Sequence, residues 1–389
     1  MNYKYSDVTI LCRVVDNYGD IGFVYRLARS LSDLAPELKL RLVVSNLESF
    51  ASMAPGLDPN RAVQEYRSWT VLDWNADDAC RIEYTKNPPT LILECFQCSR
   101  PQWLDDILFA PGRTEEVQII NIEYLTAEEW ADDVHLLKSG TRSALVKKVN
   151  FMPGFTEKTG GLVIDNEFAA SLKNPDDALL RLRDYPEYKE IEHAVCADDV
   201  FCVSLFTYKR DLSPIVRALK KYHKKLCVFV APGLSRDVFL DEWKREGEPF
   251  KTILLPYLEQ ESWDALLTLM DVNIIRGEDS FARACLCGKP FLWNAYVQDE
   301  EFQLEKVSAL LNRMEDCFAP DASIFQNYRD LMMEFNKTQD ADSYKIEYGL
   351  SEFLNSIEEV KDSFSSWGNK LLSLGNLAEK LLAYINRKA

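Results

Sequence analysis

The chain alternates between short apolar runs and segments in which apolar residues recur at helical spacing. Residues 8–12 and 40–44 are runs of aliphatic and β-branched side chains, which predict buried strands. Between them, Val24, Leu27 and Leu31 fall on one side of a helix. The strand pattern recurs at residues 90–93, 117–122, 200–206, 226–230, 252–255, 272–275 and 290–293. Strands that alternate with helices in this way predict an α/β fold with parallel sheets.

One interruption of this alternation predicts two domains. Residues 174–186 are charged and contain proline, which is typical of a linker, and a new series of strands begins at residue 200. We therefore expect two Rossmann-like domains, residues 1–185 and 186–361, that face each other across a crevice. Ligands of open α/β sheets bind outside the carboxyl ends of the strands, so we expect a ligand in that crevice.

The last segment, residues 362–389, ends in a helix with one apolar side. Leu377, Leu381 and Ile385 recur at helical spacing and need a partner surface. We expect this helix to pack back on the first domain.

Composition narrows the classes of partner. The formal net charge is −17, which argues against a nucleic acid as the main partner because phosphate backbones require a basic surface. Hydrophobic residues make up 47% of the chain, so a sizeable core is available. The negative charge permits a basic protein partner, and an anionic ligand would need a local positive pocket.

The cysteines and histidines argue against a metal site. Cys95 and Cys98 form a C-x-x-C pair, but His135, His193 and His223 are far apart in the sequence. Buried thiols in a reducing compartment are the interpretation that we favour. With no signal peptide and no apolar stretch of membrane length, we expect a cytoplasmic protein with no contact to a membrane.

The predicted connection between a strand and a helix around residue 276 is the first candidate site. Residues 272–275 predict a buried strand, and Ser280 is expected to cap a helix over residues 281–287. Residues 276–279 would then form a strand-to-helix loop with one guanidinium and two carboxylates. Such a loop faces helix N–H groups and suits a ligand with a diphosphate and sugar hydroxyls. The alternative is an ordinary helix start with a solvated acidic first turn.

A second candidate is the loop that follows the first strand. It carries Asp16 and Asp20 around a glycine turn, and Gly19 and Gly22 allow a close approach of the backbone. The spacing is neither the G-x-G-x-x-G of dinucleotide enzymes nor a P-loop. The alternative is that Asp20 only caps the next helix and Asp16 only stabilises a turn.

Several segments together resemble one known family. They are VVDNYGDIG at 14–22, NIEYLTAEE at 121–129, GFTEKTGGL at 154–162, IRGEDSF at 275–281, and GKPFLW at 288–293 followed by QDE at 298–300. In this order they resemble the EarP family, the elongation factor P arginine rhamnosyltransferases. The resemblance implies a GT-B fold and inverting transfer of L-rhamnose from dTDP-β-L-rhamnose to an arginine of elongation factor P. It implies no metal and no cofactor.

The resemblance also implies roles for individual residues. Asp20 is the expected general base, with Asp16 and Glu278 as further catalytic carboxylates. The donor-binding residues that it implies are Phe206, Tyr208, Tyr257, Gln260, Arg276, Asp279, Ser280 and Tyr296. Asn17, Tyr18 and Gly19 form the loop around the catalytic aspartates.

Some of these positions have a plainer interpretation or depart from the family. Phe206 and Tyr208 alternate along a strand, and such aromatics are most often part of a core. The family pattern has Phe where this chain has Tyr257, and Trp where it has Ile122. A tyrosine keeps an aromatic face for thymine and adds a hydroxyl.

Two other functions remain open from the sequence. The chain could be a GT-B glycosyltransferase with a different acceptor, or a non-catalytic partner of a translation factor that only senses a nucleotide sugar. The arginine rhamnosyltransferase and the non-catalytic partner both keep the donor pocket. These two functions differ at Asp16 and Asp20, which a pure binder would not need.

Overall fold

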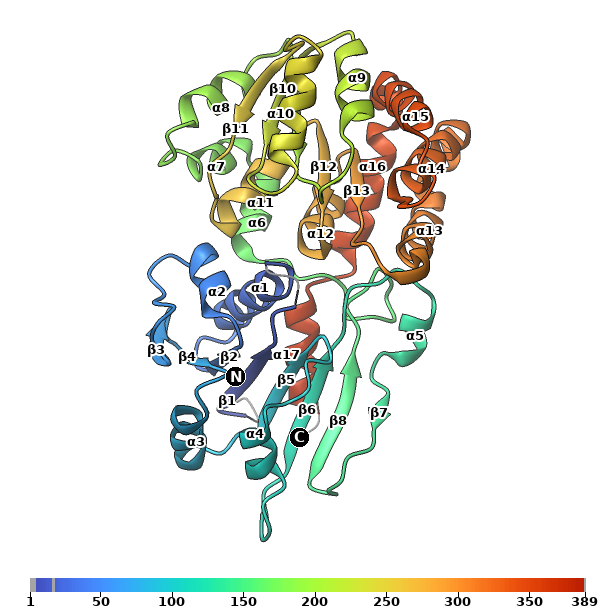
Figure 1. The fold of residues 1–389 in the computed structure, drawn as a ribbon. Coiled ribbons are helices and arrows are strands. Elements are labelled where there is room, and N and C mark those ends of the chain that lie inside the picture. The colour runs from blue at the N-terminus through green and yellow to red at the C-terminus, as the bar shows by residue number, and fades with distance from the viewer. Residues whose placement is uncertain (1–4, 16–17, 388–389) are drawn as a thin grey trace. The chain divides into compact units, whose positions relative to one another are not determined.

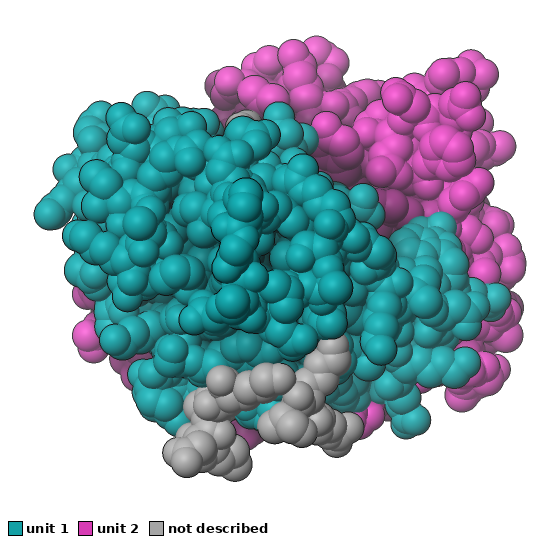
Figure 2. Space-filling model, turned by 90° about the horizontal axis from the view of Figure 1, so that it is seen from below, with its two compact units in different colours: residues 1–166, 374–389 teal, residues 167–373 magenta. Residues whose placement is uncertain are grey.

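The computed structural model describes residues 5–15 and 18–387 (Figure 1). The chain forms two compact units, coloured separately in Figure 2. Unit 1 comprises residues 1–166 and 374–389, and unit 2 comprises residues 167–373.

Unit 1 is built on a mostly parallel sheet. Its described residues form eight strands in the order β3-β4-β2-β1-β5-β6-β8-β7. The strands are β1 (Asp7–Cys12), β2 (Lys39–Val44), β3 (Val63–Tyr66), β4 (Trp69–Asp73), β5 (Leu91–Cys95), β6 (Val117–Ile122), β7 (Lys138–Ser139) and β8 (Val146–Phe151). The β3–β4 and β7–β8 pairs at the two edges are antiparallel, and the other pairs are parallel.

Helices cover both faces of this sheet. They are α1 (Gly19–Leu34), α2 (Leu47–Met53), α3 (Asp77–Lys86), α4 (Gln102–Leu108), α5 (Trp130–Val134) and α17 (Leu377–Arg387). Ile10 on β1 packs into a cluster with α1, α2 and α17, whereas the next residue, Leu11, packs into a cluster with α3 and α4. Side chains of a strand alternate between faces, so a central parallel strand must be apolar on both.

Unit 2 is a smaller parallel sheet with a larger set of helices. All of its residues are described, and its five strands run in the order β11-β10-β9-β12-β13. They are β9 (Val200–Leu205), β10 (Lys225–Val230), β11 (Lys251–Leu254), β12 (Val272–Arg276) and β13 (Phe291–Asn294). Each neighbouring pair is parallel.

The helices of unit 2 precede, separate and follow its strands, with the elements from η1 onward after the last strand, β13. They are α6 (Asn166–Lys173), α7 (Pro175–Leu180), α8 (Tyr188–Val195), α9 (Ser213–Lys221), α10 (Arg236–Arg245), α11 (Gln260–Leu269), α12 (Glu278–Cys287), η1 (Asp299–Glu301), α13 (Gln303–Met314), η2 (Glu315–Asp321), α14 (Ala322–Asn336), α15 (Ser343–Asn355) and α16 (Ile357–Ser373). None of the described helices is long and apolar enough to cross a membrane.

The segment predicted as a linker, residues 174–186, is part of unit 2, so that prediction is wrong. Ala178, Leu179 and Leu182 are buried in a cluster with residues of β10 and α11. The segment was predicted as a linker because of its many charges, although its apolar residues recur at helical spacing. The chain consequently divides after residue 166 and again after residue 373, rather than after residues 185 and 361.

Candidate active site

Arg276 lies between two aromatic rings at the carboxyl end of the unit 2 sheet. Its Cζ is 4.5 Å from the centroid of Phe206 and 4.6 Å from that of Tyr208, which is a cation–π arrangement on both sides. The two aromatics directly follow β9, which pairs with β12. The Nε of Arg276 is buried and has no hydrogen-bond partner among the described residues. A buried donor without a partner is costly, so this atom suits an anionic or carbonyl ligand.

Gly277 makes the turn from β12 into α12. Its φ of 71° and ψ of 169° belong to a region that is essentially restricted to glycine, and it is the N-cap residue of α12. The prediction that Ser280 caps this helix is therefore wrong: the helix begins at Glu278. Because one glycine replaces the expected loop, Glu278 and Asp279 lie in the first helical turn, where the helix dipole favours carboxylates.

Helix α11 contacts the first turn of α12. Gln260 Nε2 donates to Asp279 Oδ2 at 3.1 Å, and Trp263 Nε1 donates to the Ser280 hydroxyl at 3.0 Å. The Trp263 ring packs edge-on against Phe206, with centroids 5.4 Å apart. The structure thus brings together Gln260, Asp279, Ser280 and Phe206, four of the residues predicted to bind the donor. Glu278 is 3.8 Å from Lys306.

The remaining predicted donor residues are exposed tyrosines at strand ends. Tyr296 follows β13, is 56% exposed, and packs edge-on against Tyr208 with centroids 5.5 Å apart. Tyr257 lies between β11 and α11 and is 64% exposed. Both tyrosines therefore lie just beyond the carboxyl ends of strands, and ligands of parallel sheets bind at these ends.

In unit 1, Asp20 lies in the first turn of α1. The helix has Tyr18 as its N-cap residue and begins at Gly19, so Asp20 is not the cap. The Asp20 side chain is almost fully buried, and its Oδ2 accepts the N–H of Val15 at 2.7 Å. Its Oδ1 accepts a long hydrogen bond, 3.4 Å, from the hydroxyl of Tyr124.

Two predicted residues of this loop, Asp16 and Asn17, lie outside the described residues.

The negative charge of Asp20 acts on the thiol of Cys12, at the end of β1. Burial, with a further contribution from Asp20, raises the pKa of the Cys12 thiol well above its ordinary value.

Tyr124 is oriented by an aromatic stack that follows β5 and β6. Its ring stacks on Phe96, with centroids 4.4 Å apart and planes 18° apart. Phe23 of α1 packs edge-on against Phe96 at 5.2 Å. Phe96 has a φ of 60°, a left-handed turn conformation just after the end of β5. The stack holds the Tyr124 hydroxyl toward the catalytic candidate Asp20.

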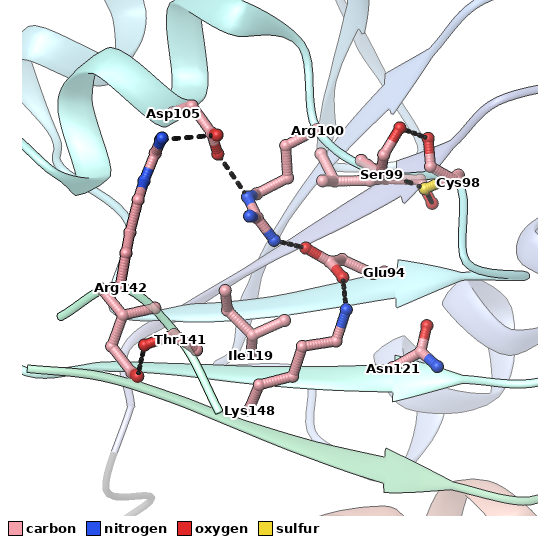
Figure 3. A network of polar contacts seen from close by, with 12 residues as sticks. Glu94, Cys98, Ser99, Arg100, Asp105, Ile119, Asn121, Thr141, Arg142 and Lys148 are labelled. Atoms are coloured by element: carbon pink, nitrogen blue, oxygen red, sulfur yellow. Dashed lines mark hydrogen bonds and ion pairs between the residues drawn. The ribbon is translucent and has the colours of Figure 1, made fainter. Parts of the chain in front are cut away.

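The acidic residue Glu94 inside β5 is structural. Its fully buried carboxylate pairs with Arg100 and, at 2.6 Å, with Lys148 of β8 (Figure 3). Asp105 extends this network, because it accepts from Arg100 Nε at 2.6 Å and from Arg142 at 2.7 Å. Each charge in the network has an opposite partner, which is the condition for burying a carboxylate.

Comparisons with known proteins identify the family of the chain. The model of the family described as Elongation-Factor P (EF-P) rhamnosyltransferase EarP matches residues 8–386. The chain belongs to the EarP family. A protein-arginine rhamnosyltransferase of Shewanella oneidensis is 30% identical and covers 97% of both chains. One of Pseudomonas putida is 32% identical, over 85% of this chain and 88% of that relative. This EarP-family chain is accordingly a glycosyltransferase, as the resemblance predicted.

Solved structures show that this EarP-family chain has the GT-B fold that was predicted. A structure described as the basis for EarP-mediated arginine glycosylation of translation elongation factor EF-P has a TM-score of 0.60 at 20% identity, covering 99% of this chain and 100% of that chain. A UDP-GlcNAc 2-epimerase from Neisseria meningitidis bound to UDP-GlcNAc has a TM-score of 0.54 at 12% identity, covering 98% of this chain and 100% of that chain.

The cysteines of this EarP-family chain are buried thiols at the predicted C-x-x-C. Cys95 and Cys98 are both buried and free, and burial together with Glu94 raises the pKa of Cys98 to about 12. Among the described residues, no three or more His, Cys, Asp or Glu side chains are grouped as metal ligands.

Two residues that hold the candidate donor-binding residues of this EarP-family chain were not singled out from the sequence. They are Trp263, which bonds to Ser280 and packs against Phe206, and Asn294. Asn294 Oδ1 accepts the N–H of Tyr208 at 3.0 Å across 86 positions of sequence. The available signal was an asparagine directly after an apolar strand, since a buried amide at that place must have partners.

Proposed function

We propose that this EarP-family member transfers L-rhamnose from dTDP-β-L-rhamnose to an arginine side chain of EF-P, with inversion at the anomeric carbon. The family and the relatives named protein-arginine rhamnosyltransferase support the arginine acceptor. The observation that carries the donor assignment is Arg276, clamped between Phe206 and Tyr208 with an unpartnered buried Nε.

The donor's diphosphate would lie at the start of α12. The helix N-terminus offers backbone N–H groups and a partial positive charge, and Arg276 adds a full charge beside it. Departure of dTDP requires stabilisation of the developing negative charge, which these groups supply without a metal ion. We accordingly propose that the reaction needs neither a metal nor a cofactor.

The nucleobase would lie against the aromatic side chains. Stacking of a base on an aromatic ring is worth about 1–3 kcal/mol and tolerates any base. Phe206, Tyr208 and the exposed Tyr257 supply aromatic surface, while Gln260 and Asp279 form a polar pair for ribose or sugar hydroxyls. Selection of thymine over other bases then depends on polar contacts rather than on stacking.

The acceptor arginine is a weak nucleophile, and this decides what Asp20 must do. The pKa of a free guanidinium is about 13 and that of aspartate about 4, so proton transfer before attack would cost roughly 12 kcal/mol. We propose that Asp20, with Asp16, holds and orients the guanidinium by charged hydrogen bonds. We also propose a catalytic role for Glu278, which lies in the first turn of α12.

In the displacement step, the guanidinium nitrogen attacks the anomeric carbon as the bond to the dTDP oxygen breaks. The electron pair of that bond leaves with dTDP, and the new C–N bond makes the attacking nitrogen far more acidic. Asp20 then takes its proton, which leaves rhamnosyl-arginine, dTDP and a protonated Asp20. One displacement with one base gives inversion.

The decisive experiment is to incubate the purified protein with dTDP-β-L-rhamnose and EF-P and to measure the intact mass of EF-P. We expect a gain of one deoxyhexose, and EF-P whose acceptor arginine is replaced by lysine should gain nothing. EDTA should leave the gain unchanged. Unchanged mass of EF-P in the presence of folded enzyme would favour another acceptor or a non-catalytic binder.

We also propose that the protein acts in the cytoplasm, because a translation factor is available there. This proposal depends on EF-P as the acceptor, and the same mass measurement tests that acceptor.

A further inference from the structure

Two buried amide side chains hold the loop that carries Tyr296. Asn336, the last residue of α14, is 3% exposed. Its Nδ2 donates to the carbonyl oxygens of Trp293, at 2.8 Å, and Met332, at 2.9 Å. Its Oδ1 accepts the N–H of Ala295 at 2.8 Å. The side chain thereby fixes the chain at the point where β13 ends and the loop begins.

The second amide holds the other end of the same loop. Gln303, the first residue of α13, is fully buried, and its Oε1 accepts the N–H of Gln298 at 3.0 Å. Its Nε2 donates to the carbonyl oxygen of Asn336 at 3.1 Å. The Gln303 side chain is thus bonded to the backbone of Asn336, and only Tyr296 and Val297 lie between the backbone positions that the two side chains hold.

The exit of the loop is bound to the chain just beyond the same helix end. Glu300 and Glu301 both have left-handed φ values, 53° and 58°, which side-chain-bearing residues adopt at a cost. Glu301 Oε1 accepts the N–H of Thr338 at 2.7 Å, its hydroxyl at 2.8 Å, and the N–H of Gln339 at 3.2 Å. These bonds offset the cost of the strained conformation and keep the loop in one shape.

A surface loop with an exposed aromatic would ordinarily be mobile. Tyr296 is more than half exposed, yet its ring packs edge-on against Tyr208, whose own N–H is held by Asn294. We propose that Asn336 and Gln303 are positioning residues for the nucleotide-sugar donor. They fix the loop so that Tyr296 stands against Tyr208 before the donor arrives, and this rests on the proposed function of Tyr296 as a donor contact.

The chemistry of the site requires amides rather than carboxylates. Asn336 donates and accepts at once, so an aspartate would keep the bond from Ala295 but lose both donated bonds. It would also bring a negative charge against two carbonyl oxygens in a buried place. Gln303→Glu would act in the same way against the carbonyl of Asn336. A fully satisfied buried network is rigid, and a partly satisfied one is not.

The test uses Asn336→Asp, with Asn327→Asp, an exposed position on the same helix, as the matched control. Hydrogen exchange of the ligand-free protein, measured by mass spectrometry, should become faster over residues 295–298 in Asn336→Asp and stay unchanged in the control. Gln303→Glu, the second variant, should act in the same direction. Unchanged exchange over this loop in both folded variants would overturn the proposal. This readout does not depend on which donor binds.

Calorimetry with dTDP-β-L-rhamnose tests the link to the donor. Asn336→Asp should weaken donor binding by on the order of tenfold, the size expected for one buried hydrogen bond. KM for the donor should rise while kcat at saturating donor changes little. In a Tyr296→Ala background, Asn336→Asp should add no further loss, because both act on one contact. An additive loss would overturn the role through Tyr296. A wild-type protein that fails to bind the donor would instead overturn the proposed function.

Discussion

Asp20 uses its two carboxylate oxygens differently. Oδ2 is fixed by the 2.7 Å bond from the N–H of Val15, whereas the Tyr124 hydroxyl lies 3.4 Å from Oδ1. The short bond sets the orientation of the side chain without needing the charge, because an amide oxygen would accept the same N–H. The long hydrogen bond from Tyr124 can shorten when a guanidinium binds.

Asp20→Asn should therefore keep the fold and the affinity for dTDP but lower kcat by on the order of 10²–10⁴, as expected when a general base is lost. Steady-state kinetics with EF-P measures the loss, and calorimetry with dTDP checks the donor site. Turnover within a few-fold of the wild type would mean that Asp20 only anchors the loop before α1.

His135 gives unit 1 a defined response to acid. Its Nδ1 accepts the N–H of Met152 at 3.1 Å, and burial, with a smaller contribution from Lys380, lowers its pKa to about 4. The unfolded chain binds a proton at this side chain near pH 6.5, so between about pH 6.5 and 4 it holds more protons than the folded chain. The stability that depends on the neutral imidazole is present above pH 6.5 and is lost as the pH falls toward 4.

We expect His135→Gln to flatten the decrease in the free energy of unfolding across this window, since glutamine cannot titrate. Urea unfolding at several pH values between 4 and 7 measures the slope for both proteins. Identical slopes would show that His135 is protonated to the same extent in the folded and unfolded chains.

At the scale of secondary-structure elements, the donor site depends on a turn of one residue between β12 and α12. Gly277 has a φ of 71° and a ψ of 169°, a backbone conformation that is high in energy for any residue with a side chain. Gly277→Ala should cost about 1–3 kcal/mol of stability. It should also move the first turn of α12 away from Arg276 and weaken dTDP binding.

The matched control is Gly140→Ala, where an added Cβ meets nothing within 4 Å and φ is ordinary. Thermal unfolding and calorimetry with dTDP should distinguish the two variants. If Gly277→Ala melted and bound dTDP like the control, the turn would not be what positions the site.

The elements themselves were largely predictable from the sequence, and the contacts between them were not. The mostly apolar run at residues 117–122 coincides with β6, whose six residues are all buried, as expected for an interior parallel strand. The start of α12 was misplaced because a serine has a stronger capping preference than the preceding glycine, and only the backbone conformation reveals the cap. The sequence pattern marks Asn294 as a polar residue after an apolar strand, but it does not identify Tyr208, 86 positions away, as its partner.

At the scale of the whole molecule, the net charge of −17 bears on the protein acceptor. An acceptor with a basic target loop would be attracted over several ångströms, and this attraction acts mainly on the association rate. Salt screens it, with a Debye length of about 8 Å at physiological ionic strength.

We expect the KM for EF-P to rise steeply with salt, while the affinity for dTDP in the absence of EF-P changes less. A short peptide around the acceptor arginine should be a poor substrate, since it lacks the folded surface that docking requires. Initial rates across a salt series, with both acceptors, make the comparison. Equal use of peptide and folded EF-P, without salt dependence, would rule out docking by charge.

The return of the chain to unit 1 imposes an order on biosynthesis. Leu377, Leu381 and Ile385 of α17 complete the apolar cluster that α1 and β1 begin, whereas residues 167–373 form unit 2 without interruption. On the ribosome, the sheet of unit 1 is translated before unit 2. It lacks its last helix, α17, until all of unit 2 has been translated. The apolar surface of unit 1 that α17 covers is therefore exposed in the nascent chain while unit 2 is being translated.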